Sequence, residues 1–118
     1  LIIYFYPRDF TAGCTAEACE FRNDFSFFRN LDIEIIGIST DTIATHKEFK
    51  KAYHLPFELL SDEKGVVARQ YKAFIPFVNL ARRITYLLDK EHKIAAAYSD
   101  WFGATRHIQE MISKIKEN

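Results

Sequence analysis

The segment YPRDFTAGCTAEACEFR, residues 6–22, decides the fold class because a strand ends and a helix begins within it. The run Leu1–Tyr6 is continuously apolar and rich in β-branched and aromatic residues, which is typical of a strand covered on both faces. Pro7 ends this strand. After a polar loop, the range Cys14–Asn30 predicts one amphipathic helix, since apolar residues recur there at spacings of three and four: Ala18, Phe21, Phe25 and Phe28.

The rest of the chain continues to alternate strand and helix patterns. The expected elements are a strand over Ile33–Ser39, a helix from Asp41 to about His54, a short strand at Leu59–Leu60, a short helix over Val66–Tyr71, an antiparallel hairpin of Arg83–Leu88 with Lys93–Tyr98, and a final helix over Thr105–Lys116. This order implies right-handed parallel crossovers, with an antiparallel pair completing the sheet. We therefore predict an α/β protein with a thioredoxin-like fold, in which helices flank a central mixed β-sheet.

Length and composition describe one soluble globular domain over residues 1–118. Sixteen basic residues balance sixteen acidic ones, so a nucleic-acid-binding face is not expected. No apolar run approaches the roughly 20 residues that span a bilayer, so no membrane association is predicted. The chain begins at Leu1 inside a strand and without an initiator methionine, so we expect an N-terminal truncation. The expected location is cytoplasmic, with a removed targeting sequence as the alternative.

Cys14 stands where the loop over residues 7–13 leads into the predicted helix. Its sulfur should face the unpaired N–H groups and the positive end of the helix dipole, which favour the nucleophilic thiolate. Thr11 can present its hydroxyl to the sulfur or to a bound peroxide oxygen. The competing interpretation makes Cys14 a small core residue, Thr11 a turn residue and Pro7 only the end of a strand.

Cys19 lies five positions after Cys14 on the same predicted helix. An ideal helix separates two such Cα atoms by roughly 8.7 Å, whereas a disulfide usually needs less than about 7 Å. If the two cysteines bond, the first turns of the helix must unwind after Cys14 is oxidised to sulfenic acid. The alternative is two unrelated cysteines, of which Cys19 simply packs.

The segment over residues 6–22 resembles the active-site segment of peroxiredoxins, specifically the bacterioferritin comigratory protein or Q type of the AhpC/TSA-like thiol peroxidases. Pro7, Thr11 and Cys14 fit the family motif P-x-x-x-T-x-x-C, and Cys19 falls where many Q-type members carry their resolving cysteine. The resemblance continues through IEIIGISTD, LPFELLSDEKG and RRITYLLD, and so covers nearly the whole chain. It implies that Cys14 is the peroxidatic cysteine and that Cys19 resolves it.

Two further residues take their roles from this resemblance. The family's active-site arginine precedes a strand in the pattern R-x-[ST]-[FY]-L, which falls on Arg83, whereas Arg82 fits less well. Arg83 would stabilise the thiolate and hold a peroxide oxygen, and is otherwise a surface arginine at the start of a strand. Glu17 matches a family position that orients the arginine, and is equally well a helix-stabilising acid near an N-terminus.

The chain departs from the family pattern in three places. Ala12 stands where Q-type members often have proline, and the family's N-terminal hairpin and strand, with its A-P-x-F element, is missing. The segment YKAFIPFVNL, residues 71–80, is also unlike its family counterpart. We expect its apolar residues to take part in ordinary packing.

The predicted function is a monomeric thiol peroxidase that reduces hydrogen peroxide and organic hydroperoxides through a Cys14 sulfenic acid and a Cys14–Cys19 disulfide. The resemblance implies thioredoxin or a similar dithiol as reductant, and the chemistry requires no metal, haem or flavin. Two alternatives stay open: a dithiol-disulfide oxidoreductase, although such enzymes usually carry C-x-x-C, and a noncatalytic binding or chaperone-like domain of the same fold.

A metal site is a weaker alternative. It would combine the two cysteines with one of the four histidines, which are His46, His54, His92 and His107. The cysteine spacing is poor for structural zinc, and the histidines are expected at the surface or at helix ends.

Overall fold

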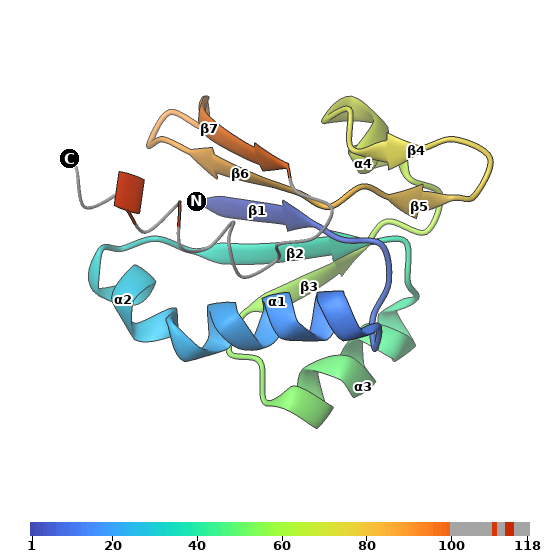
Figure 1. The fold of residues 1–118 in the computed structure, drawn as a ribbon, viewed down its shortest axis with the longest axis horizontal. Helices are drawn as coiled ribbons and strands as arrows, with labels where there is room; N and C mark the ends of the chain where they lie inside the picture. The colour runs from blue at the N-terminus through green and yellow to red at the C-terminus, as the bar shows by residue number, and fades with distance from the viewer. Residues whose placement is uncertain (100–109, 111–112, 115–118) are drawn as a thin grey trace.

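Eleven helices and strands make up the part of the chain that the computed structural model describes, which is residues 1–99, 110, 113 and 114 (Figure 1). They are β1 (Ile2–Phe5), α1 (Ala12–Asn23), α2 (Phe25–Asn30), β2 (Ile35–Ser39), α3 (Ile43–Tyr53), β3 (Glu58–Ser61), α4 (Val66–Gln70), β4 (Phe74–Ile75), β5 (Leu80–Ala81), β6 (Ile84–Leu88) and β7 (Ile94–Ser99). Most of the helix predicted over Thr105–Lys116 lies outside the described residues.

The central sheet has five strands in the order β3-β2-β1-β6-β7, and β4 and β5 form a separate antiparallel pair. Strands β1, β2 and β3 are mutually parallel, while β6 runs antiparallel to both β1 and β7. This is the mixed sheet that the sequence predicted. Because the three parallel strands run in one direction, their carboxyl ends lie along one edge, where α/β proteins place their reactive groups.

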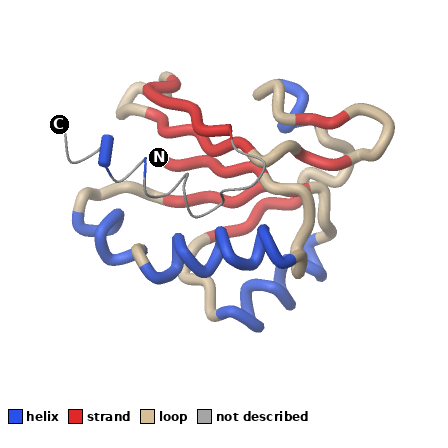
Figure 2. Tube along the Cα trace, viewed as in Figure 1, coloured by secondary structure: helices blue, strands red, loops and turns tan. Residues whose placement is uncertain are grey.

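Strand β1 is covered on both faces, as its continuous apolar sequence requires. Successive side chains of a strand point to opposite faces. Ile2, Tyr4 and Tyr6 join the core under α1, α2 and α3, whereas Ile3 and Phe5 join a second core with α4. Figure 2 shows α1, α2 and α3 together on one side of the strands. None of the helices in the described part of the chain is long and apolar enough to cross a membrane.

The single helix predicted over Cys14–Asn30 is wrong, because the chain forms two helices that meet at Asp24. The side chains of asparagine and aspartate compete with helical hydrogen bonds, which favours a break at Asn23–Asp24. The change of direction lets Phe28 of α2 be fully buried near Phe21 of α1, with 6.1 Å between ring centroids.

The β4–β5 pair was not predicted, and the expectation of ordinary packing for its segment fails at the turn. Phe77 is fully exposed and Val78 is 54% exposed. Phe77 and Asn79 have positive φ, and Asn79 fixes the turn by donating from its side chain to the Glu63 carbonyl at 3.0 Å. Strands of two residues are too short to show any periodicity, so the sequence pattern could not reveal them.

Candidate active site

Cys14 lies in the first turn of α1, just past the carboxyl end of β1, and is 1% exposed. Thr11 precedes the helix in extended backbone and its side chain caps no helix N–H group. Instead, the Thr11 hydroxyl donates to the Arg8 carbonyl at 2.9 Å. The first N–H groups of a helix have no acceptor within the helix, so those near Cys14 keep their capacity to bind an anion.

Arg83 reaches Cys14 from the residue before β6. Its Nη2 donates to Cys14 Sγ at 3.1 Å, and its Nη1 donates to Glu17 Oε1 at 3.0 Å. One forked guanidinium therefore holds the sulfur and the carboxylate together, which a lysine ammonium would not do with the same geometry. Arg82 beside it is exposed. The structure thus brings together three residues that were singled out from the sequence.

Glu17 is completely buried one turn after Cys14 on α1. Burial raises the pKa of Glu17 to about 8, and the charge and hydrogen bond of Arg83 offset only part of this rise. Near neutral pH the carboxyl group therefore tends to hold a proton. A neutral Glu17 does not balance the positive charge of Arg83, which also contacts the Cys14 sulfur.

Gly13 contributes to the site by lacking a side chain, a feature that the sequence analysis missed. A Cβ atom at this position would lie 3.0 Å from Arg83 Nη2, the atom that bonds to Cys14. Ala12, which stands where related sequences often have proline, is the first residue of α1. A side chain at this position would therefore push the guanidinium away by a few tenths of an ångström.

Cys19 lies on the same continuous helix as Cys14, and neither cysteine is in a disulfide. Cys19 is partly exposed, whereas Cys14 is buried. The structure does not bring the two sulfurs together, as expected for positions five residues apart on an intact helix. Pro7 is partly exposed at the start of the loop that leads to Thr11.

A second buried polar cluster, which the sequence analysis missed, lies at the same edge of the sheet. Asp9 accepts a hydrogen bond from the Tyr6 hydroxyl at 2.6 Å, and its other oxygen lies 2.5 Å from His46 Nδ1. The other ring nitrogen, Nε2, lies 3.1 Å from the Leu60 carbonyl. The histidines were expected at the surface or at helix ends; His46 lies near the start of α3 but is only 4% exposed, so it is not a surface residue.

The His46 ring lies between two groups that can accept hydrogen bonds, the Asp9 carboxyl group and the Leu60 carbonyl. A carboxylate and a carbonyl both need an N–H donor, so both ring nitrogens carry a proton when Asp9 is ionised. Burial alone would lower the pKa of His46, but the hydrogen bond and charge of Asp9 outweigh burial and raise it. The contact with Asp9 therefore favours the protonated form of His46, and Asp41 lies close by.

The predicted metal alternative gains no support. Among residues 1–99 and the three described beyond them, the single group of potential metal ligands is Asp9, Asp41 and His46, which contains neither cysteine. These atoms already bond to one another and to protein groups, since Asp41 Oδ2 accepts from the Asp9 N–H and the Ser39 hydroxyl. His54 and His92 are exposed, and His107 lies outside the described residues.

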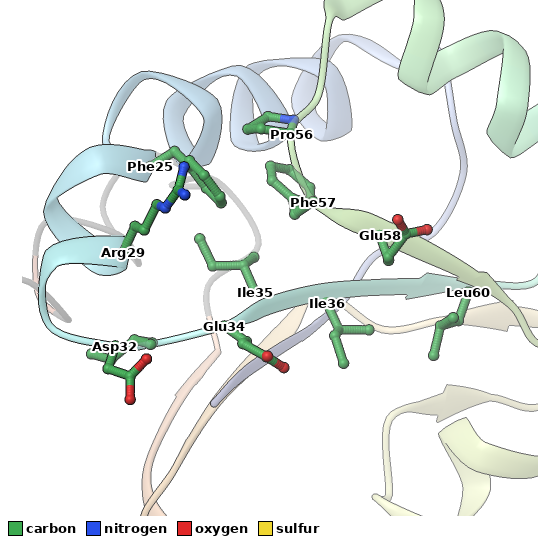
Figure 3. Close-up of a pocket in the computed structure, with 11 residues that line it drawn as sticks. Phe25, Arg29, Asp32, Glu34, Ile35, Ile36, Pro56, Phe57, Glu58 and Leu60 are labelled. Atoms are coloured by element: carbon green, nitrogen blue, oxygen red, sulfur yellow. The ribbon is translucent and has the colours of Figure 1, made fainter.

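A pocket of about 500 Å³ lies away from the Cys14 cluster. Figure 3 shows that its walls come from α2, from the chain that leads into β2 and the start of β2, and from β3 with the residues before it. Its lining residues are Phe25, Arg29, Asp32, Ile33, Glu34, Ile35, Ile36, Pro56, Phe57, Glu58 and Leu60. Leu60 also contacts the Asp9 cluster, since its carbonyl lies 3.1 Å from His46 Nε2, but Cys14, Glu17 and Arg83 do not line the pocket.

Comparison with known proteins gives a consistent result. The chain matches the AhpC/TSA family over residues 1–97. It is 44% identical over 119 aligned residues to the chloroplastic peroxiredoxin Q of Oryza sativa subsp. japonica, an alignment that covers 98% of this chain and 54% of the relative. The chain therefore spans about half the length of this relative.

Solved structures share the same fold. The peroxidoxin BcpB of Mycobacterium tuberculosis superposes with a TM-score of 0.91 at 29% identity, covering 98% of this chain and 77% of the other. The bacterioferritin comigratory protein of Xanthomonas campestris, described for its alkyl peroxide reduction activity, gives a TM-score of 0.89 at 25% identity, covering 99% and 77%. The predicted α/β class with a thioredoxin-like fold is confirmed by this likeness.

Proposed function

The chain belongs to the AhpC/TSA family, and we therefore propose that it is a thiol peroxidase of the peroxiredoxin Q type, with Cys14 as its peroxidatic cysteine. The observation that carries the proposal is the forked contact of Arg83 with Cys14 Sγ and Glu17 Oε1. It places a permanent positive charge against a buried sulfur beside the N-terminus of α1, and both features stabilise a thiolate. Arg83 and Thr11 are the residues that we expect to bind the peroxide.

In the first step, the Cys14 thiolate attacks the terminal oxygen of a hydroperoxide, ROOH. An S–O bond forms as the O–O bond breaks, which gives Cys14 sulfenic acid and an alkoxide that takes a proton to become ROH. Charge develops on the departing oxygen, so fixed donors lower the barrier. Arg83 and the first N–H groups of α1 supply such donors, and the Thr11 hydroxyl, which already donates to Arg8, can accept the O–H of the peroxide.

In the second step, Cys19 resolves the sulfenic acid. Its thiolate attacks the sulfur of Cys14, an S–S bond forms, and hydroxide leaves and is protonated to water. Because both cysteines lie on one continuous helix, residues 14–19 must leave their helical conformation before the sulfurs can meet. We propose that this local unwinding is part of every turnover.

In the third step, an external dithiol reduces the Cys14–Cys19 disulfide by thiol exchange and becomes a disulfide itself. Thioredoxin is the proposed reductant, and hydrogen peroxide and organic hydroperoxides are the proposed substrates. The alkyl peroxide reduction described for the Xanthomonas campestris relative supports the organic class. We further propose that the domain acts as a monomer. Its cytoplasmic location stays a prediction, and the chloroplastic relative adds weight to the alternative of a removed targeting sequence.

Intact-mass measurement with thiol counting tests the proposal. After one equivalent of hydrogen peroxide, the wild type should lose two thiols and two mass units, while Cys19→Ser should accumulate a sulfenic acid that dimedone traps. Cys14→Ser is the matched control and should keep its remaining thiol. If both wild-type thiols survive, the chain is not a peroxidase of this kind, and a sulfenic acid without a disulfide would remove Cys19 from the mechanism.

A further inference from the structure

The loop over residues 7–11, which ends with Thr11 before α1, has a single buried residue. That residue is Asp9, whose side chain is 0% exposed, whereas Phe10 and Thr11 after it are exposed. Ordinary loops place their charged residues in water and seldom bury one without a partner. The buried carboxyl group of Asp9 therefore anchors this loop to the interior of the protein.

Asp9 is held through both its side chain and its backbone. The Asp9 side chain accepts a hydrogen bond from the Tyr6 hydroxyl and contacts His46 Nδ1. The Asp9 N–H donates to Asp41 Oδ2 at 2.8 Å. Asp41 is fixed in turn by the Ser39 hydroxyl at 2.6 Å. The loop is thus tied to the end of β1, to the end of β2 and to α3, which are three elements that hold their own places in the sheet and core.

The next residue, Phe10, is seated on the same helix. Its ring lies 5.1 Å from that of Phe49 and 6.3 Å from that of Tyr53, measured between centroids. His46, Phe49 and Tyr53 are three and four positions apart, so they share one face of α3. Phe10 has a φ of 65°, a left-handed conformation that is costly for an aromatic residue and persists only where its surroundings impose it.

The position of Thr11 depends on Asp9 and Phe10, which precede it in the loop. Its hydroxyl bonds to the carbonyl of Arg8, the residue before Asp9, and its own carbonyl accepts the N–H of Thr15 at 2.8 Å to begin α1. A rotation of the loop at Asp9 or Phe10 would therefore move the Thr11 hydroxyl relative to Cys14. Neither Asp9 nor His46 is exposed enough to touch a substrate.

We propose that Asp9 and His46 are positioning residues of the peroxidase reaction, whose contact holds the loop so that the Thr11 hydroxyl faces a peroxide bound at Cys14. This inference rests on the proposed function and adds a task to a pair of residues that lies outside the Cys14 cluster. It assigns to His46 a role in the reaction with peroxide, and none in making the sulfur nucleophilic.

The test compares two reactions of the same sulfur. In His46→Phe, the rate constant for oxidation of Cys14 by hydrogen peroxide should fall about 30- to 100-fold, because a displacement of about 1 Å has this effect on a positioned group. Alkylation of Cys14 by iodoacetamide, which needs no contact with Thr11, should change less than about twofold. His54→Asn, at the exposed residue that ends α3 with a left-handed backbone that asparagine tolerates, is the matched control and should leave both rates unchanged.

A double-mutant cycle with Thr11→Val separates positioning from general loosening. If His46 acts through Thr11, adding His46→Phe to Thr11→Val should slow peroxide oxidation by no more than about twofold. Equal losses in the two backgrounds would overturn the inference, as would a folded His46→Phe that reacts with peroxide at the wild-type rate.

His46→Gln covers the case in which His46→Phe does not fold, because glutamine keeps a donor for the buried Asp9 carboxylate. The same double-mutant cycle is then measured with His46→Gln. This substitution should slow peroxide oxidation of Cys14 about tenfold in the wild-type background and should not slow it further in Thr11→Val. A wild type that forms no sulfenic acid would instead refute the proposed function, so the two failures are distinguishable.

Discussion

Two buried polar clusters lie at the carboxyl edge of one sheet, and they differ in how fully their hydrogen-bonding capacity is used. In the Asp9 cluster, the Tyr6 hydroxyl, both ring nitrogens of His46 and both carboxylate oxygens have partners. In the Cys14 cluster, a single guanidinium serves both Cys14 and Glu17 beside an uncapped helix end. Saturated networks hold a shape, whereas spare donors beside a sulfur are what an incoming oxygen needs.

The two clusters also lie on different structural elements. The Asp9 cluster joins the loop after β1 to α3, so it can persist while α1 changes. Cys14 and Glu17 both lie on α1 within residues 14–19, the segment that has to unwind if the cysteines are to bond. In the proposed mechanism, the Asp9 cluster therefore keeps its contacts through the reaction cycle, whereas the Cys14 cluster separates when α1 unwinds.

The largest expected effect tests whether Arg83 is what makes the second cluster reactive. Arg83→Met should lower the rate constant for peroxide oxidation of Cys14 about 10²- to 10³-fold, which is the usual loss on removing one preorganised donor. Arg83→Lys should recover only part of this loss, because it restores charge without the fork. The readout is stopped-flow oxidation followed by thiol counting.

Arg82→Met is the matched control, since Arg82 is exposed and adjacent in sequence. It removes the same charge from the same strand end and should change the rate less than about twofold. Equal losses in the two methionine variants would mean that a general field, and not the contact with Cys14, supports the reaction.

The sequence predicted the order of helices and strands well because that order depends on local patterns of apolar residues. Continuous apolar runs predict strands buried on both faces, and the run Leu1–Tyr6 did so correctly. The Asp9 cluster could not be predicted in this way, because a loop aspartate and a polar-flanked histidine look solvent-exposed in sequence. Only the fold brings Asp9 and His46, 37 positions apart, to within hydrogen-bonding distance.

The Cys14 cluster was predicted for a different reason. Its residues follow the motif of a known family, which supplied Arg83 where spacing alone could not connect it to Cys14. Gly13 escaped notice because its contribution is an absent Cβ atom, which matters only once Arg83 Nη2 is placed beside it. The break at Asp24 escaped because apolar spacing continues across it.

A second prediction sharpens the comparison through pH. The folded state raises the pKa of Glu17 from 4.5 to about 8, so between these values it binds a proton that the unfolded chain releases. The free energy of unfolding should therefore fall as pH rises through this window, by up to about 1.4 kcal/mol per unit, and level off above it. Glu17→Gln should remove this contribution and leave that of His46, whose raised pKa gives a slope of the same sign, as measured by urea unfolding between pH 5 and pH 9.

Both proteins in this pH comparison should carry Cys14→Ser, so that no thiol at the site titrates. Glu20→Gln, which removes a partly exposed carboxylate from the same helix, is the matched control and should keep the slope. A slope unchanged in Glu17→Gln would show that the buried carboxyl is ionised throughout. Glu17 would then compete with the thiolate for the charge of Arg83, and the contrast with the saturated Asp9 cluster would weaken.

The smallest expected effect concerns the fit between Gly13 and Arg83. Glycine destabilises a helix relative to alanine by up to about 1 kcal/mol, so Gly13→Ala should make α1 more stable. The added Cβ would lie 3.0 Å from Arg83 Nη2 and displace the guanidinium slightly from Cys14, so peroxide oxidation should slow severalfold. Ala16→Gly, at an exposed position of α1, is the opposite control and should lower stability without slowing the reaction.

If Gly13→Ala makes the protein more stable and also slows peroxide oxidation, the slower reaction cannot be explained by a loss of stability. A Gly13→Ala protein that gains stability and keeps its full rate would show instead that the contact of Arg83 with Cys14 tolerates displacement, and that the reactive cluster is less closely fitted than the Asp9 cluster beside it.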